Sequence, residues 1–206
     1  MSIFALMNHN SALSDEWSEN VIIVDGDYID SVAFNLTVNF ERMIGRRIPK
    51  ADMAHWLDCI ALDGGIREGE HDTQVVFIHS KKNKMLKNFA PSDYEEELNG
   101  KAFKDNLGEF TMSSYPVEDI TSTDDFLLEV MKTAANHKDV KRVMVIANTD
   151  NAEMIDLIRH DLRDADDEKR ITVFAMQPIA GGNFRQEILG YSMLSALGIK
   201  SSEIRG

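Results

Sequence analysis

Five short apolar runs along the chain have the length and composition of buried β-strands. Each is rich in β-branched or aromatic residues, and the apolar positions are nearly continuous, which is typical of a strand covered on both faces. The runs are VIIV at 21–24, QVVFIHS at 74–80, GEFTMSS at 108–114, RVMVIAN at 142–148 and ITVFAM at 171–176.

Apolar residues recur at steps of three and four in the segments between these runs, which indicates amphipathic helices. The last of these helices is expected to end where Gly198 can cap it. The expected helices are Val32 to Met43, Met53 to Ile60, Phe126 to Ala134, Met154 to Leu162, Gln186 to Ala196, and a weaker one from Tyr94 to Asn106.

The alternation of strands and helices favours a parallel sheet. The sequence therefore predicts an α/β fold that is doubly wound, with a mainly parallel five-stranded sheet and helices on both faces. At 206 residues, 43% of them hydrophobic, the chain is long enough for one sizeable core. We expect a single domain at 21–206, preceded by a polar lead segment at 1–20.

Composition limits the cellular compartments in which the protein is expected. The one cysteine, Cys59, excludes an internal disulfide and favours a reducing compartment. No apolar run reaches the roughly 18 residues of a transmembrane helix, and the first residues lack the basic start and cleavage site of a signal peptide. We expect a soluble, cytoplasmic protein that does not cross a membrane.

Net charge limits contact with nucleic acid. The formal charge of -13 opposes general attraction, since the field of the whole molecule repels a phosphate backbone. Any such contact is therefore expected to be local. The densest basic run is KKNKMLK, with Lys81, Lys82, Lys84 and Lys87, and a solvated surface is the simpler interpretation of it.

Polar residues that directly follow the predicted strands are the main candidates for a site. In doubly wound sheets, ligands bind outside the carboxyl ends of the strands, where the strand order reverses. The residues at these ends are Asp25 and Asp27 after the first run, His79 and Ser80 after the second, and residues 148–151 after the fourth.

Acids near two predicted helix starts have a simpler explanation as well. In TSTDDF at 121–126, Ser122 and Asp125 match a capping box. TDNAEM, which contains Asp150, has the form of a helix cap followed by an acid. Asp25 is harder to explain in this way, because it ends an apolar strand where burial and neighbouring charges raise the pKa of a carboxyl group.

A divalent cation would resolve the conflict between burial and charge at Asp25. Mg²⁺ and Mn²⁺ prefer oxygen ligands, keep several waters, and need only one or two direct carboxylates. Zinc is not expected, because the six histidines and the single cysteine are scattered without zinc-ligand spacing.

The order of elements and acids resembles the PIN-like nuclease superfamily, and within it the NYN domains. The stretches that carry the resemblance are VIIVDGDYID, TSTDDFLLEVM and VMVIANTDNAEMIDLI, followed by ITVFAM and GGNF, and together they span roughly residues 21–198. The resemblance implies a three-layer sandwich with a metal centre. It implies that Asp25, Asp124 or Asp125, and Asp150 are acids of this centre.

Three positions depart from the pattern of that family. Asn148 stands where the family has its first fourth-strand aspartate, so one charge is missing from the implied metal ligands. Asp27 and Asn151 stand where the family usually has an asparagine and an aromatic residue. A divergent, incomplete metal centre is therefore expected, with Asp25, Asp125, Asn148 and Asp150 as its ligands.

The chemistry implied by the resemblance is metal-assisted hydrolysis of single-stranded RNA. Asp25, Asp27 and Asp150 are the candidate catalytic residues. The candidate contacts to the substrate are Lys81, Lys82 and Lys84, which follow the strand next to the first one, and Tyr28, whose ring could stack on a base.

Two other functions remain open from the sequence. DGDY at the end of the first strand is also similar to the haloacid dehalogenase phosphatases, with Asp25 as nucleophile and Asp27 as general acid, although the residue usual after that motif is missing. Alternatively, the fold serves as a non-catalytic interaction module that binds a second copy of itself or another protein, consistent with Asn148 and the net acidity.

Overall fold

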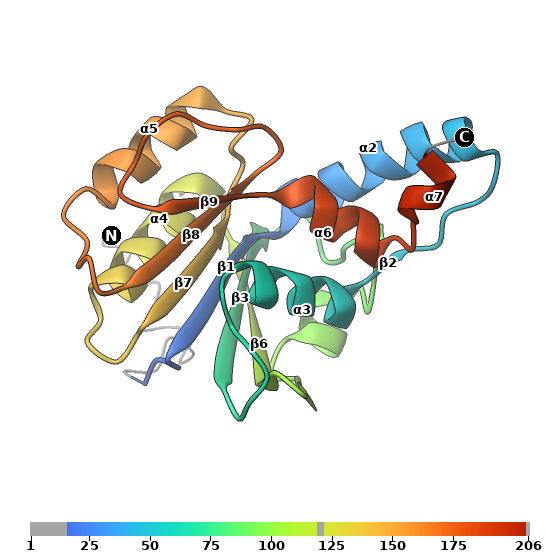
Figure 1. Ribbon diagram of the computed structural model, residues 1–206. Helices are drawn as coiled ribbons and strands as arrows, with labels where there is room; N and C mark the ends of the chain where they lie inside the picture. Colours follow the sequence, from blue (N-terminus) through green and yellow to red (C-terminus); the bar gives the residue numbers. More distant parts are fainter. Residues whose placement is uncertain (1–15, 119–121, 205–206) are drawn as a thin grey trace.

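The computed structural model describes residues 16–118 and 122–204 (Figure 1). Most of the expected lead segment at 1–20 lies outside this range. Of its last residues, Trp17 packs against the hydrophobic core and Asn20 begins the first strand. The strands are β1 (Asn20–Asp25), β2 (Ala51–Asp52), β3 (Asp72–Ser80), β4 (Phe89–Ala90), β5 (Ala102–Asp105), β6 (Gly108–Val117), β7 (Arg142–Ile146), β8 (Arg170–Ala175) and β9 (Arg185–Ile188).

The helices connect the strands and cover the sheet (Figure 1). Two short ones, η1 and α7, add a single π-helical turn and a turn near the end of the chain. The helices are α2 (Gly26–Ile44), α3 (Met53–Asp63), η1 (Tyr94–Leu98), α4 (Thr123–Asn136), α5 (Ala152–Asp161), α6 (Leu189–Ala196) and α7 (Ser201–Ile204).

The central sheet has seven strands in the order β5-β6-β3-β1-β7-β8-β9. All neighbours pair in parallel except β5 and β6, which are antiparallel. The six parallel strands, numbered by their place in the chain, follow the order 3-2-1-4-5-6 of a doubly wound sheet. The mainly parallel α/β sheet is therefore confirmed, and its strand order reverses between β1 and β7.

The expected count of five strands was wrong. The five apolar runs are all strands of the sheet, but β5 and β9 extend it at its two edges. Both are four residues long and largely exposed. An edge strand that buries few side chains does not need the continuous apolar run by which the other five were recognised.

Two expected helices are also corrected. The weak helix from Tyr94 to Asn106 is a single π-helical turn, followed by β5. The last helix begins at Leu189 instead of Gln186, because residues 186–188 belong to β9. Its expected cap is confirmed, since Gly198 has a φ of 70° and donates its N–H to Ser195 O.

Side chains alternate between two hydrophobic clusters along the sheet, one on each face. Ile22 and Val24 of β1 belong to the cluster that contains buried residues of α2, α3 and α6. Val21 and Ile23 belong to the cluster that contains those of α4 and α5. Helices therefore pack on both faces of the sheet, as the apolar runs predicted (Figure 1).

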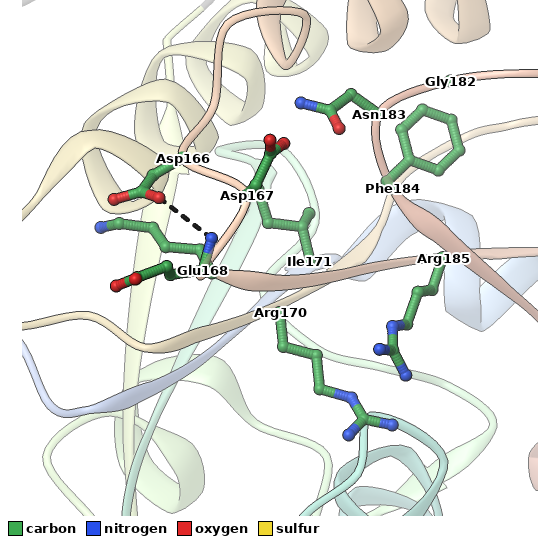
Figure 2. Close-up of a pocket in the computed structure, with 10 residues that line it drawn as sticks. Asp166, Asp167, Glu168, Arg170, Ile171, Gly182, Asn183, Phe184 and Arg185 are labelled. Carbon is green, nitrogen blue, oxygen red and sulfur yellow. Dashed lines mark hydrogen bonds between the residues drawn. The ribbon is translucent and has the colours of Figure 1, made fainter.

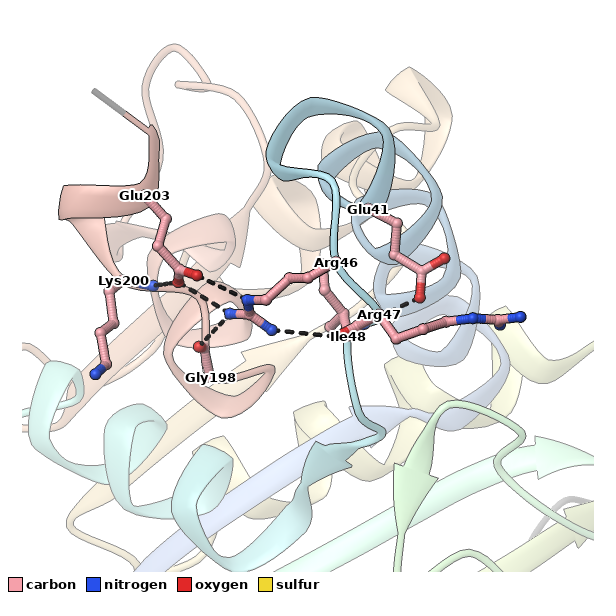
Figure 3. Close-up of polar contacts among 7 residues, drawn as sticks. All are labelled: Glu41, Arg46, Arg47, Ile48, Gly198, Lys200 and Glu203. Atoms are coloured by element: carbon pink, nitrogen blue, oxygen red, sulfur yellow. Dashed lines mark hydrogen bonds and ion pairs between the residues drawn. The ribbon is translucent and has the colours of Figure 1, made fainter. Parts of the chain in front are cut away.

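The chain near its C-terminus is fastened to the far end of α2 by one arginine (Figure 3). Arg46 donates from Nε and Nη2 to the two carboxylate oxygens of Glu203, at 2.7 and 2.9 Å, and from Nη2 to Gly198 O at 3.1 Å. Arg46 is thus occupied by an internal ion pair. In the part of the chain that the structure describes, no helix is both long and apolar enough to cross a bilayer.

Candidate functional site

The strand order places the candidate site at the carboxyl ends of β1 and β7. The two strands pair in parallel, with Val24 opposite Ile146. β1 then ends at Asp25, and the chain after β7 continues through residues 147–151 into α5. A ligand of a doubly wound sheet binds where the order of strands reverses, and that place is between these two strand ends.

Asp25 is a buried residue that ends β1 and directly precedes the first residue of α2. Its side chain is the N-cap of α2, and Oδ1 accepts a hydrogen bond from Tyr28 N at 2.9 Å. The residue is only 5% exposed. Burial raises the pKa of Asp25 from 3.8 to about 7, against the hydrogen bond from Tyr28, and the charges of Asp27 and Asp124 add to the rise.

Asp124 is the acid of α4 that acts on Asp25. Ser122 caps the helix by accepting from Asp125 N at 3.0 Å, as the sequence predicted. Asp124 is partly buried, whereas Asp125 is exposed. Burial raises the pKa of Asp124, and the charges of Asp125 and Glu153 raise it further. Of the two acids, Asp124 is the one whose charge acts on Asp25, whereas Asp125 was the expected ligand.

Asp150 lies in the same region as Asp25, because the charges of both act on the hydroxyl group of Tyr28. The Tyr28 hydroxyl is buried, and the side chains of Thr149 and Asp150 are the polar groups that act on it. Burial raises the pKa of Tyr28, followed by the charge of Asp150, and Asp25 contributes in the same direction. Asp25 and Asp150 therefore lie on the same side of the molecule, around one phenol. Tyr28 is only 7% exposed, so its ring is not available to stack on a base.

The loop between β7 and α5 presents neutral oxygens to this region. Asn148 has a buried Oδ1 without a hydrogen-bond partner among the described residues. Thr149 is buried and donates from Oγ1 to Phe174 O at 3.4 Å. Asn151 is the N-cap of α5 and accepts from Glu153 N at 3.1 Å. Asn151 thus has a structural role, while Asn148 keeps an unused acceptor.

Asp27 holds the loop that follows β3. Its Oδ2 accepts from Ser80 N and its Oδ1 from Asn83 Nδ2, both at 2.8 Å. Each carboxylate oxygen therefore accepts one hydrogen bond from this loop, and Asp27 positions the backbone that follows β3.

Asp30 anchors the same loop one helical turn further on. It accepts from Lys87 N at 3.0 Å, and its Oδ1 accepts from Asn88 N at 2.8 Å and from Asn88 Nδ2 at 3.0 Å. The acids at the start of α2 thus bind backbone N–H groups that would otherwise lack partners.

Gly26 brings η1 against the start of α2. A Cβ atom at this position would lie 2.1 Å from the hydroxyl oxygen of Tyr94, so only glycine fits. The Tyr94 ring in turn stacks on His79, with ring centroids 3.7 Å apart and planes 3° apart. The glycine of the DGD motif therefore has a packing role that brings η1 close to Asp25.

The candidate lysines lie on the β3 side of the acids. Lys81 forms an ion pair with Glu118, and Lys82 is exposed. Lys84 and Lys81 line a cavity of about 640 Å³ together with His79, Tyr94 and Tyr115. Three acids, Asp93, Glu95 and Glu96, line it too. The cavity is of mixed charge and is not a basic channel.

His79 is the one buried histidine in this cavity. It is 4% exposed, and burial lowers its pKa against the hydrogen bond to Ser80 O. Its Nε2 has no partner among the described residues. A neutral imidazole stacked on a phenol here is a packing element with one unused nitrogen.

The oxygen donors at the end of β1 limit the kind of metal that could bind. Within residues 16–118 and 122–204, no three His, Cys, Asp or Glu side chains are grouped so that they could hold a metal ion. A cation here would therefore use at most two carboxylates and would need neutral oxygens. Mg²⁺ and Mn²⁺ accept one or two carboxylates with water, and the unpartnered Oδ1 of Asn148 is a suitable neutral donor, so the residues present fit such an ion.

A second pocket lies away from the acids, beside β8 and β9 (Figure 2). Its volume is about 340 Å³, and it is lined by residues 166–171 and 182–185. The segment 166–170 leads into the start of β8, which is the opposite end of the sheet from Asp25. This pocket is therefore not part of the acidic site.

The comparisons with known proteins give a family but no function. A family model described as a family of unknown function, DUF6621, matches residues 14–204. No curated protein and no solved structure matches the chain.

The loop anchor at Asp30 leads to a test of stability. Replacing Asp30 by alanine leaves the Lys87 and Asn88 N–H groups without their acceptor, and we expect the free energy of unfolding to fall by about 2 kcal/mol. Urea unfolding measures this change. Asp164→Ala, which removes an exposed carboxyl group, is the control and should change stability by less than about 0.5 kcal/mol. Equal losses in the two variants would show that Asp30 is not an anchor.

The raised pKa of Asp25 leads to a test of pH dependence. Because folding raises this pKa from 3.8 to about 7, the folded protein binds more protons than the unfolded chain between these values, and its stability falls as the pH rises. Asparagine does not ionise, and its amide oxygen can still cap α2. Asp25→Asn should therefore match the wild type near about pH 4 and exceed its stability at about pH 8 by on the order of 3 kcal/mol. A difference that does not grow with pH contradicts this account.

Proposed function

The chain belongs to the DUF6621 family, a family of unknown function, and we propose that it is a PIN-like domain of the NYN type that binds one divalent cation and cleaves single-stranded RNA. One observation carries the proposal. The charge of Asp124 acts on Asp25, and the charges of Asp150 and Asp25 both act on the hydroxyl group of Tyr28, at the point where the strand order reverses.

The energetics of Asp25 support a positively charged ligand. A carboxyl group that is 5% exposed and has acidic neighbours is costly to ionise. A cation bound beside it favours the ionised form and so lowers its pKa. With such an ion bound, an apolar strand can end in acidic residues without unbalanced negative charge.

The sheet supports the finer assignment of the fold. Six parallel strands in the order 3-2-1-4-5-6, with helices on both faces, agree with the three-layer sandwich of the PIN-like superfamily that the motifs implied. The antiparallel edge strand β5 is an addition to that order.

The chain provides a role for each residue of the acidic centre. Asp25 and Asp124 would hold the cation, together with the buried Oδ1 of Asn148. When bound, a divalent cation lowers the pKa of a coordinated water and neutralises charge that develops on a phosphate. Asp150 is exposed next to the Tyr28 hydroxyl, where its carboxylate can accept a proton from an attacking water.

Asp27 and the lysines have supporting roles in this proposal. Asp27 fixes the start of the loop that carries Lys81, Lys82 and Lys84. Lys84 lies on the wall of the cavity beside His79 and can meet a phosphate there. Lys81 has to leave Glu118 before it can do the same, so binding of RNA is expected to be weak and dependent on salt.

The phosphatase alternative gains no support from the geometry. That mechanism needs a free general acid at Asp27, and both oxygens of Asp27 accept hydrogen bonds. The interaction module is favoured by one observation. Phe34 and Val38, one turn apart on α2, are 53% and 38% exposed, and Met43 on the same helix is 64% exposed.

Two adjacent acids of α4 provide a matched pair of variants for the cation. We expect Mn²⁺ to bind the wild type with saturation, and Asp124→Asn to weaken this binding by about tenfold, because it removes one ligand charge. Asp125→Asn removes the same charge one position further on, from an exposed side chain, and should change binding by less than about twofold. Isothermal titration measures all three proteins.

Cleavage of single-stranded RNA completes this test. Asp25→Asn and Asp150→Asn should each lower the cleavage rate by about 100-fold or more. If the folded wild type neither binds Mn²⁺ nor cleaves RNA, the nuclease proposal fails. Self-association that weakens in Phe34→Ser and not in Asp25→Asn would then support the interaction module.

A further inference from the structure

Four arginines gather at the end of the sheet opposite the acidic centre. Arg142 begins β7, Arg170 begins β8, Arg185 begins β9, and Arg67 lies in the loop between α3 and β3. We call this group the arginine face. No part of the proposed nuclease mechanism uses it, because the acids lie at the carboxyl ends of the strands and these arginines at the amino ends.

Strand register places three of the four side chains on one face of the sheet. Arg142 is directly opposite Arg170, and Arg185 is opposite Thr172, two residues further along β8. Met144 and Phe174, which alternate in step with Arg142 and Arg170, belong to the cluster under α3 and α6. Figure 2 shows Arg170 and Arg185 extending from their strands to the same side.

More positive charges than negative charges act on Arg142. Burial lowers the pKa of Arg142, and the charges of Arg170, Arg67 and Arg185 lower it further. Glu19 acts in the opposite direction, but it already binds Lys141 at 3.0 Å and His71 at 3.3 Å. Asp166, Asp167 and Glu168 line the pocket to which Arg170 and Arg185 contribute, so the local excess of positive charge, in a chain with a net charge of -13, lies around Arg142.

Two of the arginines also have unused donors. Nε of Arg142 and Nε of Arg170 are buried and have no hydrogen-bond partner among the described residues. Nη1 of Arg142 donates to Asn20 Oδ1 at 2.8 Å. A buried donor without an acceptor is costly, and two like charges on adjacent strands increase that cost.

The backbone of the α3–β3 loop fixes the position of Arg170. A Cβ atom at Gly65 would lie 2.4 Å from Cζ of Arg170, and Gly65 has a φ of 95°. Only glycine fits there, so the guanidinium is held close to the loop that carries Arg67. Close packing therefore sets the position of Arg170, whereas Arg185 is an exposed side chain.

We propose that the arginine face binds a compact anion that carries two phosphate groups, such as inorganic pyrophosphate or the diphosphate of a small molecule. Planar guanidinium groups bind phosphate oxygens through paired hydrogen bonds. Strands lie about 4.8 Å apart, so two adjacent guanidiniums suit neighbouring phosphates. A compact anion fits better than nucleic acid, because Arg142 and Arg170 are partly buried and the net charge repels a long polyanion.

Titration with inorganic pyrophosphate tests the proposal. In a buffer with EDTA and little salt, we expect saturable binding with a Kd of about 1 mM or below. Arg170→Met should weaken it by about tenfold or more, because the variant removes one guanidinium. Arg163→Met removes an exposed arginine from the loop after α5 and is the matched control, expected to bind as the wild type does.

A second variant and a second ligand keep the test decisive. Arg185→Met changes an exposed side chain, should fold normally, and should also weaken pyrophosphate binding. Asp25→Asn should bind pyrophosphate as the wild type does, which separates this site from the nuclease proposal. Lack of saturable binding by the wild type, or wild-type binding in both Arg170→Met and Arg185→Met, overturns the proposal. A single-stranded RNA that displaces pyrophosphate at lower concentration would show that the ligand is nucleic acid and would also overturn it.

Discussion

The structure depends on how the protein accommodates three carboxyl groups where a buried strand meets the start of a helix. β1 is apolar and inaccessible, and within six residues the chain carries Asp25, Asp27 and Asp30. Backbone N–H groups meet all three. Asp25 caps α2, whereas Asp27 and Asp30 accept from the segment 80–88 that follows β3. These bonds fix the loop beside the strand ends.

These hydrogen bonds determine which of the three acids is available for chemistry. Asp27 and Asp30 are half-buried, and the oxygens of both carboxylates accept hydrogen bonds from the loop. Asp25 accepts hydrogen bonds from backbone N–H groups at the start of α2, including that of Tyr28, but burial and the charges of Asp27 and Asp124 oppose its ionisation. At Asp25, burial opposes ionisation, so a positive charge beside it would stabilise the ionised form. At the other end of the sheet, the arginine face concentrates positive charge around Arg142. Our two proposals therefore assign ligands of opposite sign to the two ends of the sheet.

Much of the fold could be predicted from the sequence, because the five central strands are buried on both faces and leave continuous apolar runs. The edge strands β5 and β9 could not, because their side chains are largely exposed. At the site, the sequence located Asp25 and Asp150 at strand ends, but it could not choose between Asp124 and Asp125. That choice depends on the rotation of α4 against the sheet. The anchoring roles of Asp27 and Asp30 depend on a loop more than fifty residues away, and no local pattern reports such a contact.

The most direct test of the central claim is the pKa of Asp25, measured by the carbon chemical shift of its carboxyl group during an NMR titration. The account predicts a value of about 7. It further predicts that the value falls in Asp124→Asn, because a neighbouring negative charge is removed. A value near the ordinary 3.8 of an exposed aspartate, unchanged by Asp124→Asn, would contradict the claim that these acids share one buried site.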